Sequence, residues 1–293
     1  MMLIYNDYAG SRGFKNDLDP CLKIFQDAGY EDISVFRSEH IPHICQHLNK
    51  FGKDDFDTIV AAGGDGTLNA VVSSVLNKGI NTKIGIIPAG TSNDFASHLK
   101  IEKHYTKAAE IITKGNTIKV DVGKANDRYF INVFGAGLIT NISHYVDPAM
   151  KSILGNFAYY LKGIEKLQSY TPMPVKITTS DRVIEEDIYF FLALNSARAG
   201  GFDKLVEGAS VRDGLLDMLA VRAGHIGDIV ALLLKFFMGE HINDERVIHF
   251  RDKYALIEGR GQKNSFETNI DGENGPPMPV EINMYKSAIE VYM

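Results

Sequence analysis

The residues with the clearest chemical potential lie in the stretch Asp57 to Asn69, which reads Asp-Thr-Ile-Val-Ala-Ala-Gly-Gly-Asp-Gly-Thr-Leu-Asn. Gly63, Gly64 and Gly66 allow backbone angles that a Cβ atom would forbid, and they let an anion approach the main chain. A helix that starts directly after them would point its free N–H groups at that anion. The spacing therefore indicates a phosphate-binding loop, although an ordinary strand-to-helix turn can carry the same glycines.

A strand and a helix must hold this loop in place. Residues 58–62 form a short apolar run rich in β-branched residues, which is typical of a buried strand and too short for a helix. On the other side, Thr67 is expected to cap a helix that begins near Leu68. The loop would then lie at the carboxyl end of a strand, where nucleotides bind in open α/β sheets.

A second polar loop follows the next predicted strand, residues 83–88, and reads Ala-Gly-Thr-Ser-Asn-Asp from Ala89 to Asp94. Taken alone, Asp94 is a helix cap. Because parallel strands end at one edge of a sheet, Asp65 and Asp94 are expected to face one cleft. Two aspartates beside phosphate-binding amides are favourable when Mg²⁺ accompanies a nucleotide, since Mg²⁺ takes oxygen ligands and bridges phosphate charge.

The order of the other elements predicts two domains. Strands at residues 2–5, 33–36, 58–62 and 83–88 alternate with helices at 15–28, 40–51 and 68–77, which indicates a doubly wound parallel sheet over residues 1–121. Strands then follow strands. The later ones are predicted at residues 119–124, 129–134, 175–179, 188–195, 215–221, 255–258 and 279–284, with helices at 152–168 and 226–238. We expect a mainly antiparallel second domain over residues 122–284.

The second domain contains two Asp-Gly turns and one strongly apolar helix. Asp213-Gly214 is either a plain turn or part of a hard-cation site with nearby carbonyl groups. Asp271-Gly272-Glu273 offers Glu273 as a general base, and the alternative is an exposed turn carboxylate. The helix at 226–238 is too short to span a bilayer, and burial against a sheet is favoured over contact with lipid.

Composition excludes several classes of protein. The 293 residues include 31 basic and 37 acidic ones, for a net charge of −6. The protein as a whole therefore has no positive field that would attract nucleic acid. Cys21 and Cys45 lack metal-ligand spacing, and two such thiols indicate a reducing compartment, for which the cytoplasm is expected. We find no secretion signal and no uninterrupted apolar run of about 18 residues.

Together these motifs resemble the diacylglycerol kinase catalytic family, the bacterial lipid kinases related to sphingosine kinases and, more distantly, NAD kinases. The likeness spans essentially the whole chain. It rests on Gly63 to Asn69 and Pro88 to Ala96, and then on Val120-Asp121-Val122-Gly123, Tyr159-Tyr160-Leu161-Lys162-Gly163, Asp213-Gly214 and Asp271-Gly272-Glu273. It implies a nucleotide-binding α/β domain and a β-sandwich domain with inserted helices, with the last strand, about 285–293, returning to the first domain.

The resemblance also implies roles for particular residues. The ATP-binding set would be Gly63, Gly64, Asp65, Gly66, Thr67, Leu68, Asn69, Ala70 and Thr91, with Ser38 at the end of the second strand. Glu273 would be the base. Asp213 would bind a structural Mg²⁺ with main-chain oxygens of Ser210 and Leu215. Asp65 and Asp94 would join Glu273 among the catalytic residues and, with Asp121, would belong to an acidic, water-linked network between the domains. Asp271 and Lys162 would support this network, and Lys162 would approach the phosphates or the lipid.

The first loop departs from the family pattern. Relatives usually read Asn-Pro-x-Ser-Gly, whereas this chain reads Asn6-Asp7-Tyr8-Ala9-Gly10, so the stiff proline and one hydroxyl are missing. Asn6 and Gly10 remain as nucleotide-binding candidates. The basic residue that commonly follows the glycine is displaced by one place to Arg12. Asp7 adds negative charge near the expected phosphates.

These observations predict an ATP- and Mg²⁺-dependent lipid kinase that phosphorylates diacylglycerol at a membrane surface, as a cytoplasmic protein in transient peripheral contact. Lys151, Lys162 and Lys166 form either a local basic edge or a solvated helix face. Alternative acceptors are phosphatidylglycerol, a sphingoid base or NAD. An ATP-binding protein with little turnover is the alternative from another class, and a purely structural scaffold has little support. A homodimer is compatible with the sequence, and no nucleic-acid partner is expected.

Overall fold

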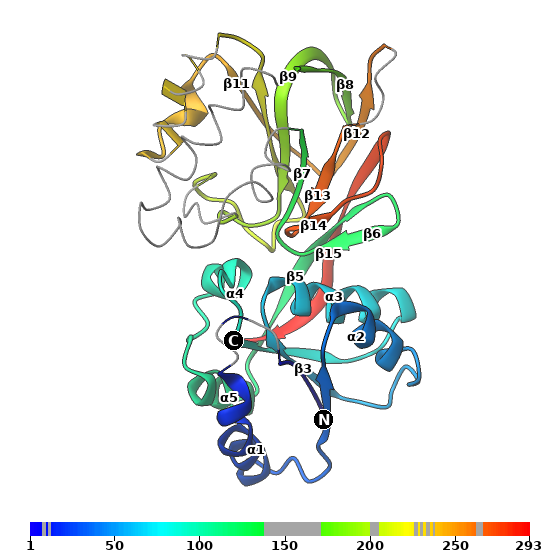
Figure 1. Ribbon diagram of the computed structural model, residues 1–293, viewed down its shortest axis with the longest axis vertical. Helices are drawn as coiled ribbons and strands as arrows, with labels where there is room; N and C mark the ends of the chain where they lie inside the picture. The colour runs from blue at the N-terminus through cyan, green and yellow to red at the C-terminus, as the bar shows by residue number, and fades with distance from the viewer. Residues whose placement is uncertain are drawn as a thin grey trace. The chain divides into compact units, whose positions relative to one another are not determined.

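The computed structural model of the protein divides into two compact units, Met1–Val122 with Tyr285–Met293, and Gly123–Met284 (Figure 1). The chain passes between them within two strands, β5 (Thr117–Ala125) and β15 (Val280–Tyr292). The structure describes residues 1–7, 10, 13–137, 171–199, 205–225, 228, 231, 232, 235, 236, 238–261 and 266–293.

The first unit is built around a parallel sheet. Its elements are β1 (Met2–Asn6), η1 (Phe14–Asn16), α1 (Leu18–Asp27), β2 (Ser34–Ser38), α2 (Ile41–Leu48), β3 (Thr58–Gly63), α3 (Asp65–Lys78), β4 (Lys83–Pro88), α4 (Asp94–His98) and α5 (Tyr105–Thr113). The end of β15 pairs in parallel with β4, and the strand order is β15-β4-β3-β1-β2. Helix α1 packs beside α5, and α2 beside α3 (Figure 1).

Strand β3 is the central strand of this unit, and its burial reflects that position. Every residue of β3 is buried, as expected for a strand covered by helices on both faces of the sheet. Edge strand β2 is mostly exposed, and only its last residue, Ser38, is buried. Because β1, β3 and β4 are parallel neighbours, the loops that follow them leave the sheet at one edge.

The second unit is antiparallel. It contains β6 (Arg128–Phe130), β7 (Val133–Gly137), β8 (Met173–Thr179), β9 (Val183–Leu194), β10 (Leu216–Arg222), η3 (His241–Asn243), β11 (Val247–Asp252), β12 (Tyr254–Gly259), β13 (Thr268–Ile270) and β14 (Glu273–Asn274). The strands run in the order β14-β13-β7-β9-β8-β12-β15, and β10 joins β9 to β11. Pairings of neighbouring strands here are antiparallel, as predicted.

Strands β9 and β10 are covered on both faces. Alternate residues such as Phe191 and Met218 belong to one apolar cluster, and Leu192 and Leu219 belong to another. The second cluster also takes in Leu232 and Phe236, which lie in the predicted helix at 226–238. For these two residues the burial alternative is therefore correct.

Several predictions differ from the structure. Helix α3 begins at Asp65, three residues earlier than expected, because Gly64 takes the N-cap position. Thr67 consequently lies inside the first turn, and the prediction that it caps the helix is wrong. The strand predicted at 129–134 is divided into β6 and β7 at Ile131 and Asn132. Helix α5 was not predicted, and the helix predicted at 152–168 lies outside the described residues.

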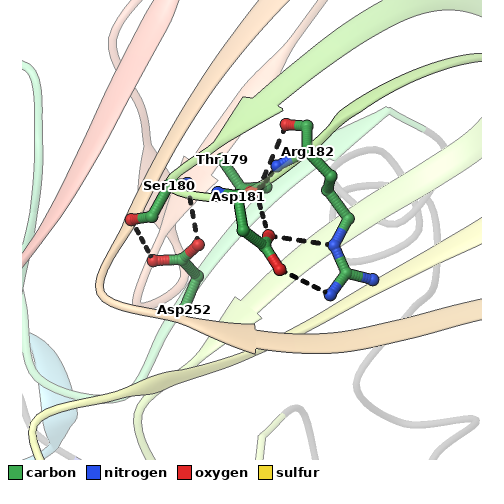
Figure 2. A network of polar contacts seen from close by, with 5 residues as sticks. All are labelled: Thr179, Ser180, Asp181, Arg182 and Asp252. Carbon is green, nitrogen blue, oxygen red and sulfur yellow. Dashed lines mark hydrogen bonds and ion pairs between the residues drawn. The ribbon is translucent and has the colours of Figure 1, made fainter.

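A polar turn between β8 and β9 shows how this unit closes a hairpin (Figure 2). Arg182 donates two 3.0 Å hydrogen bonds to Asp181, and Thr179 donates one of 2.9 Å. These donors, Arg182 first, lower the pKa of Asp181 to about 2. Ser180 donates its N–H and hydroxyl to Asp252, at 2.8 and 2.7 Å. The turn is exposed, so its ion pair contributes little to stability.

Asp244, just before β11, also pairs with basic side chains, but its carboxylate is buried. Its side chain is 3% exposed and accepts 2.7 Å hydrogen bonds from Arg246 and Lys235. The Arg246 guanidinium, followed by Lys235, holds the pKa of Asp244 well below its usual range. The native carboxyl thus stays ionised at pH values where the unfolded chain binds a proton.

We expect Asp244→Asn to lower the free energy of unfolding at pH 7 by about 1–3 kcal/mol, the usual worth of hydrogen bonds to a charged group. Because the native pKa lies below the unfolded value of about 3.9, this stabilisation is complete above that value. It is lost as the pH falls through 3.9 toward the native pKa. Urea unfolding at pH 7 and pH 3.5 measures the change. The exposed Asp187→Asn is the control, and a constant difference at both pH values would contradict the assignment.

Candidate functional site

The glycine loop joins the buried strand β3 to helix α3. The first bond of the helix runs from the N–H of Leu68 to the carbonyl oxygen of Gly64, at 3.1 Å. The N–H groups of Asp65, Gly66 and Thr67 therefore precede the intrahelical ladder and point out of the helix end. This end carries the positive pole of a 14-residue helix, which makes it a suitable site for phosphate.

The second glycine loop touches the first through its backbone. The N–H of Ala89 donates to the carbonyl oxygen of Gly63 at 2.9 Å. A Cβ atom on Gly90 would lie only 2.3 Å from the Cα of Gly64. Asn93, at φ +51°, closes the loop by exchanging two hydrogen bonds with the backbone of Gly90, at 2.9 and 2.8 Å. The predicted convergence of these two loops at one edge of the sheet is confirmed.

Asp65 links the two loops. Its two carboxylate oxygens accept hydrogen bonds from the N–H groups of Asp94 and Phe95, each at 3.2 Å. Those groups form the start of helix α4, so a carboxylate from the first turn of α3 caps a second helix. In this arrangement Asp65 positions the loop that carries Asp94. The structure thus brings the two predicted aspartates together through the backbone of Asp94.

The first loop, which follows β1, meets the same two loops. The side-chain amide of Asn6 lies 3.5 Å from the hydroxyl of Thr67. Gly10 has φ +53°, and a Cβ atom there would lie 2.5 Å from the carbonyl oxygen of Ala89. Residues 8, 9, 11 and 12 are outside the described part of the chain. Three glycine-bearing loops therefore converge beside the N-terminus of α3.

The other predicted nucleotide residues differ in what they can offer. The side chains of Leu68 and Ala70 are buried in the first unit, so only their backbone could reach a ligand. Asn69 accepts a 3.0 Å hydrogen bond from Ser73, and Thr91 is exposed on the second loop. Ser38 is buried and donates its hydroxyl to the carbonyl oxygen of His40 at 2.7 Å. Thr91 has the most accessible hydroxyl of this predicted set.

Asp121 is fully buried in β5, within the first unit. One carboxylate oxygen accepts a 2.7 Å hydrogen bond from the N–H of Ser287, which has φ +54° in β15. Asp121 therefore holds an irregular position of the returning strand. Its predicted part in a water-linked acidic network stays a prediction.

Glu273 is presented by a tight hairpin in the second unit. Ile270 of β13 pairs with Glu273 of β14, and Asp271 and Gly272 between them have φ +48° and +93°. Positive φ at both central residues is the pattern of a type I′ turn, which an Asp-Gly sequence favours. Glu273 is exposed, so its carboxylate is accessible on the turn.

Asp271 anchors this hairpin to the connection between β6 and β7. Its carboxylate accepts hydrogen bonds from the N–H groups of Ile131, Asn132 and Val133, at 2.8, 3.0 and 2.8 Å. Its own N–H donates to the carbonyl oxygen of Val133 at 3.0 Å. The Asp271 side chain thus fixes the place from which Glu273 projects.

We expect Asp271→Asn to destabilise the protein by about 1.5–3 kcal/mol, because an amide has one acceptor oxygen where the carboxylate has two. Asparagine accepts positive φ as readily as aspartate does, so the backbone is not the cause. Urea unfolding gives the change in free energy. The exposed Asp187→Asn variant is the control, and wild-type stability of Asp271→Asn would show that the three hydrogen bonds do not hold the hairpin.

Asp213, the side chain of the predicted Mg²⁺ site, is already paired with protein groups in the structure. One carboxylate oxygen of Asp213 accepts a 3.0 Å hydrogen bond from the N–H of Leu215, and the other pairs with Arg251. Arg251 also lies 3.2 Å from Asp217, whose side chain is buried. A divalent cation at Asp213 would require this guanidinium to move. Mg²⁺ at Ser210, Asp213 and Leu215 stays a prediction that this side-chain arrangement does not fit.

The remaining predictions concern three lysines, a metal ion and the two cysteines. Lys162, with Lys151 and Lys166, lies outside the described residues. Within the described ranges, no three His, Cys, Asp or Glu side chains are grouped closely enough to hold a metal ion. Both cysteines are free thiols, and burial raises the pKa of Cys21 to about 12, so that thiol is unreactive.

Comparisons with known families cover both units. Residues 1–125 match the family described as the diacylglycerol kinase catalytic domain. Residues 132–293 match the family described as the YegS C-terminal NAD kinase beta sandwich-like domain. The predicted fold class, a nucleotide-binding α/β domain followed by a β-sandwich domain, is confirmed by these matches and by the strand pairing described above.

Individual relatives match over nearly their whole length. A diacylglycerol kinase of Bacillus subtilis (strain 168) is 34% identical over 97% of this chain and 93% of its own. One from Staphylococcus carnosus (strain TM300) is also 34% identical, over 99% and 94%. A crystal structure of a diacylglycerol kinase from Bacillus anthracis superposes with a TM-score of 0.79 at 27% identity, covering 99% of this chain and 96% of that one.

Proposed function

The chain belongs to the diacylglycerol kinase family of lipid kinases, and we propose that it transfers the γ-phosphoryl group of Mg-ATP to the primary hydroxyl of diacylglycerol, giving phosphatidic acid. The observation that carries this proposal is the convergence of three glycine-bearing loops at the N-terminus of α3. The likeness to relatives named diacylglycerol kinases, of which 93% and 94% of the length is matched, supports diacylglycerol as the acceptor.

The backbone of the first unit would bind the nucleotide. N–H groups of Asp65, Gly66 and Thr67 at the start of α3 would donate to phosphate oxygens, with the helix pole adding positive potential. Gly64 and Gly90 let the backbones of the two loops approach each other closely beside this helix end. Mg²⁺ arriving with ATP would offset the charge on the phosphoryl oxygens, which supplies much of the catalysis in this reaction class.

Glu273 would act as the general base. Its carboxylate takes the proton of the lipid hydroxyl as the hydroxyl oxygen attacks the γ-phosphorus. The bond from that phosphorus to the β–γ bridging oxygen breaks, and ADP leaves with the electron pair. Asp271 keeps the hairpin of Glu273 fixed through its three N–H contacts, which would restrict the base to a productive position.

The acceptor lies in a membrane, so we propose that the protein reaches it by transient peripheral contact. Among the helices of the described ranges, none combines the length and hydropathy that a bilayer crossing requires. A phosphatidylglycerol or sphingoid-base kinase would use the same phosphate site and differ only in the acceptor.

The test is transfer of labelled phosphate from ATP to mixed micelles that contain diacylglycerol, phosphatidylglycerol or sphingosine, with NAD as a soluble acceptor. We expect labelled phosphatidic acid to be the main product, and its formation to require Mg²⁺. Another labelled lipid, or labelled NADP, would replace the proposed acceptor. ATP binding without transfer to any acceptor would instead favour a nucleotide-sensing protein.

A further inference from the structure

Asp7, the residue that departs from the family's first loop, is paired with Arg37 of the neighbouring strand. β1 and β2 are parallel, with Asn6 opposite Ser38. The N–H of Asp7 donates to the carbonyl oxygen of Ser38 at 3.2 Å, which extends the strand ladder one residue beyond Asn6. The Asp7 carboxylate lies 2.5 Å from the Arg37 guanidinium. Proline at position 7 could make neither contact.

The burial of the two side chains is unequal. Asp7 is 15% exposed and Arg37 is 51% exposed. The carboxylate is therefore fixed in the protein, while the guanidinium covers it from the solvent side. An aspartate next to a phosphate site would repel the ligand, and Arg37 neutralises that charge at a distance of one hydrogen bond.

The pair holds one end of the first loop, and the glycine loops hold the other. Asp7 is fixed to Arg37 and Ser38, whereas Gly10, three residues later, lies against Ala89 and Gly90 so closely that a Cβ atom would collide. Asn6, just before the pair, reaches Thr67 of the phosphate-binding helix. The direction in which the chain leaves β1 thus determines whether Asn6 and Gly10 meet the other loops.

We propose that Arg37 is a positioning residue for nucleotide binding, acting through Asp7 to hold the first loop against the two glycine loops. The inference rests on the proposed function, because the ligand considered is ATP. Under this proposal Asp7 favours ATP binding despite its negative charge. The competing view is that Asp7 merely repels phosphate, and the two views predict opposite signs for the removal of its charge.

The experiment measures the dissociation constant of Mg-ATP by calorimetry for Asp7→Asn, Arg37→Gln and the double variant. Each single change should weaken binding about two- to five-fold, the worth of one partly exposed ion pair. The double variant should be no weaker than either single one, since both remove the same interaction. In lipid phosphorylation KM for ATP should rise while kcat stays within about two-fold, and Arg37→Lys should restore most of the affinity.

The matched control is Arg182→Gln, which breaks the exposed Asp181–Arg182 pair of the second unit and should leave ATP binding unchanged. Tighter or unchanged binding by Asp7→Asn would overturn the proposal, as would additive losses in the double variant, which would mean that Arg37 acts without Asp7.

Hydrogen exchange of the Asp7 amide in the nucleotide-free protein separates this inference from the proposed function. Exchange should speed up in Asp7→Asn and in Arg37→Gln, because the bond to the Ser38 carbonyl is loosened. Unchanged exchange in both variants would overturn the positioning role even where ATP binds normally. A wild-type protein that does not bind ATP would instead overturn the proposed function.

Discussion

Glu273→Gln is expected to lower kcat for lipid phosphorylation by about 10²- to 10⁴-fold while leaving the dissociation constant of Mg-ATP unchanged. Glutamine keeps the size of the side chain and cannot accept the hydroxyl proton. The substitution falls on an exposed residue of the hairpin, and the Asp271 contacts that hold this hairpin remain intact. Stability should therefore stay at the wild-type level.

The measurement is initial velocity over a range of diacylglycerol and ATP concentrations, alongside ATP binding by calorimetry. Glu185→Gln is the matched control, because Glu185 is an exposed glutamate on β9 of the same unit with no proposed role in the reaction. A fully active Glu273→Gln protein would remove Glu273 from the mechanism and leave the kinase assignment itself untouched. A loss of ATP binding would show a structural role instead.

The sequence could predict the phosphate loop because its signal is local. Gly63, Gly64 and Gly66 directly follow a run of buried strand residues, and parallel strands bring successive loops to one edge. The convergence of the two glycine loops at one edge follows from that rule, whereas the close approach of Gly64 and Gly90 is seen only in the structure. By contrast, threonine is a residue type that favours the N-cap position, which is why Thr67 is predicted as the cap. Only the extended backbone of Gly64 shows that the helix starts earlier.

The supporting contacts could not be predicted, because they join positions far apart in the chain. Asp271 accepts hydrogen bonds from Ile131 to Val133, about 140 residues earlier, and no pattern near Asp271 points to those donors. The same contacts explain why the strand predicted at 129–134 is broken, since three of its N–H groups donate to a carboxylate. Asp65 likewise accepts a hydrogen bond from Asp94, and Asp7 pairs with Arg37, and the fold alone brings these groups close.

The tight contact between the glycine loops carries the second large prediction. In Gly90→Ala the new methyl carbon would start 2.3 Å from the Cα of Gly64 and 2.9 Å from the Asn93 side chain. Ordinary contact begins near 3.4 Å. The nearest atom belongs to the backbone, which cannot turn aside as a flexible side chain can. The two loops must move apart by about 1 Å, and a displacement of that size at a reacting group can cost about 100-fold in rate.

We therefore expect Gly90→Ala to lower kcat/KM for ATP by about 100-fold, with a stability loss of about 1–3 kcal/mol from overpacking. Gly64→Ala should have a smaller effect, because its methyl carbon would lie 3.2 Å from the Cα of Gly90. Gly224→Ala is the control, since a Cβ atom there would meet one side-chain oxygen at 4.0 Å. If Gly90→Ala kept the wild-type kcat/KM, or if Gly64→Ala were the more damaging change, the approach of these two loops would not set the geometry of the phosphate site.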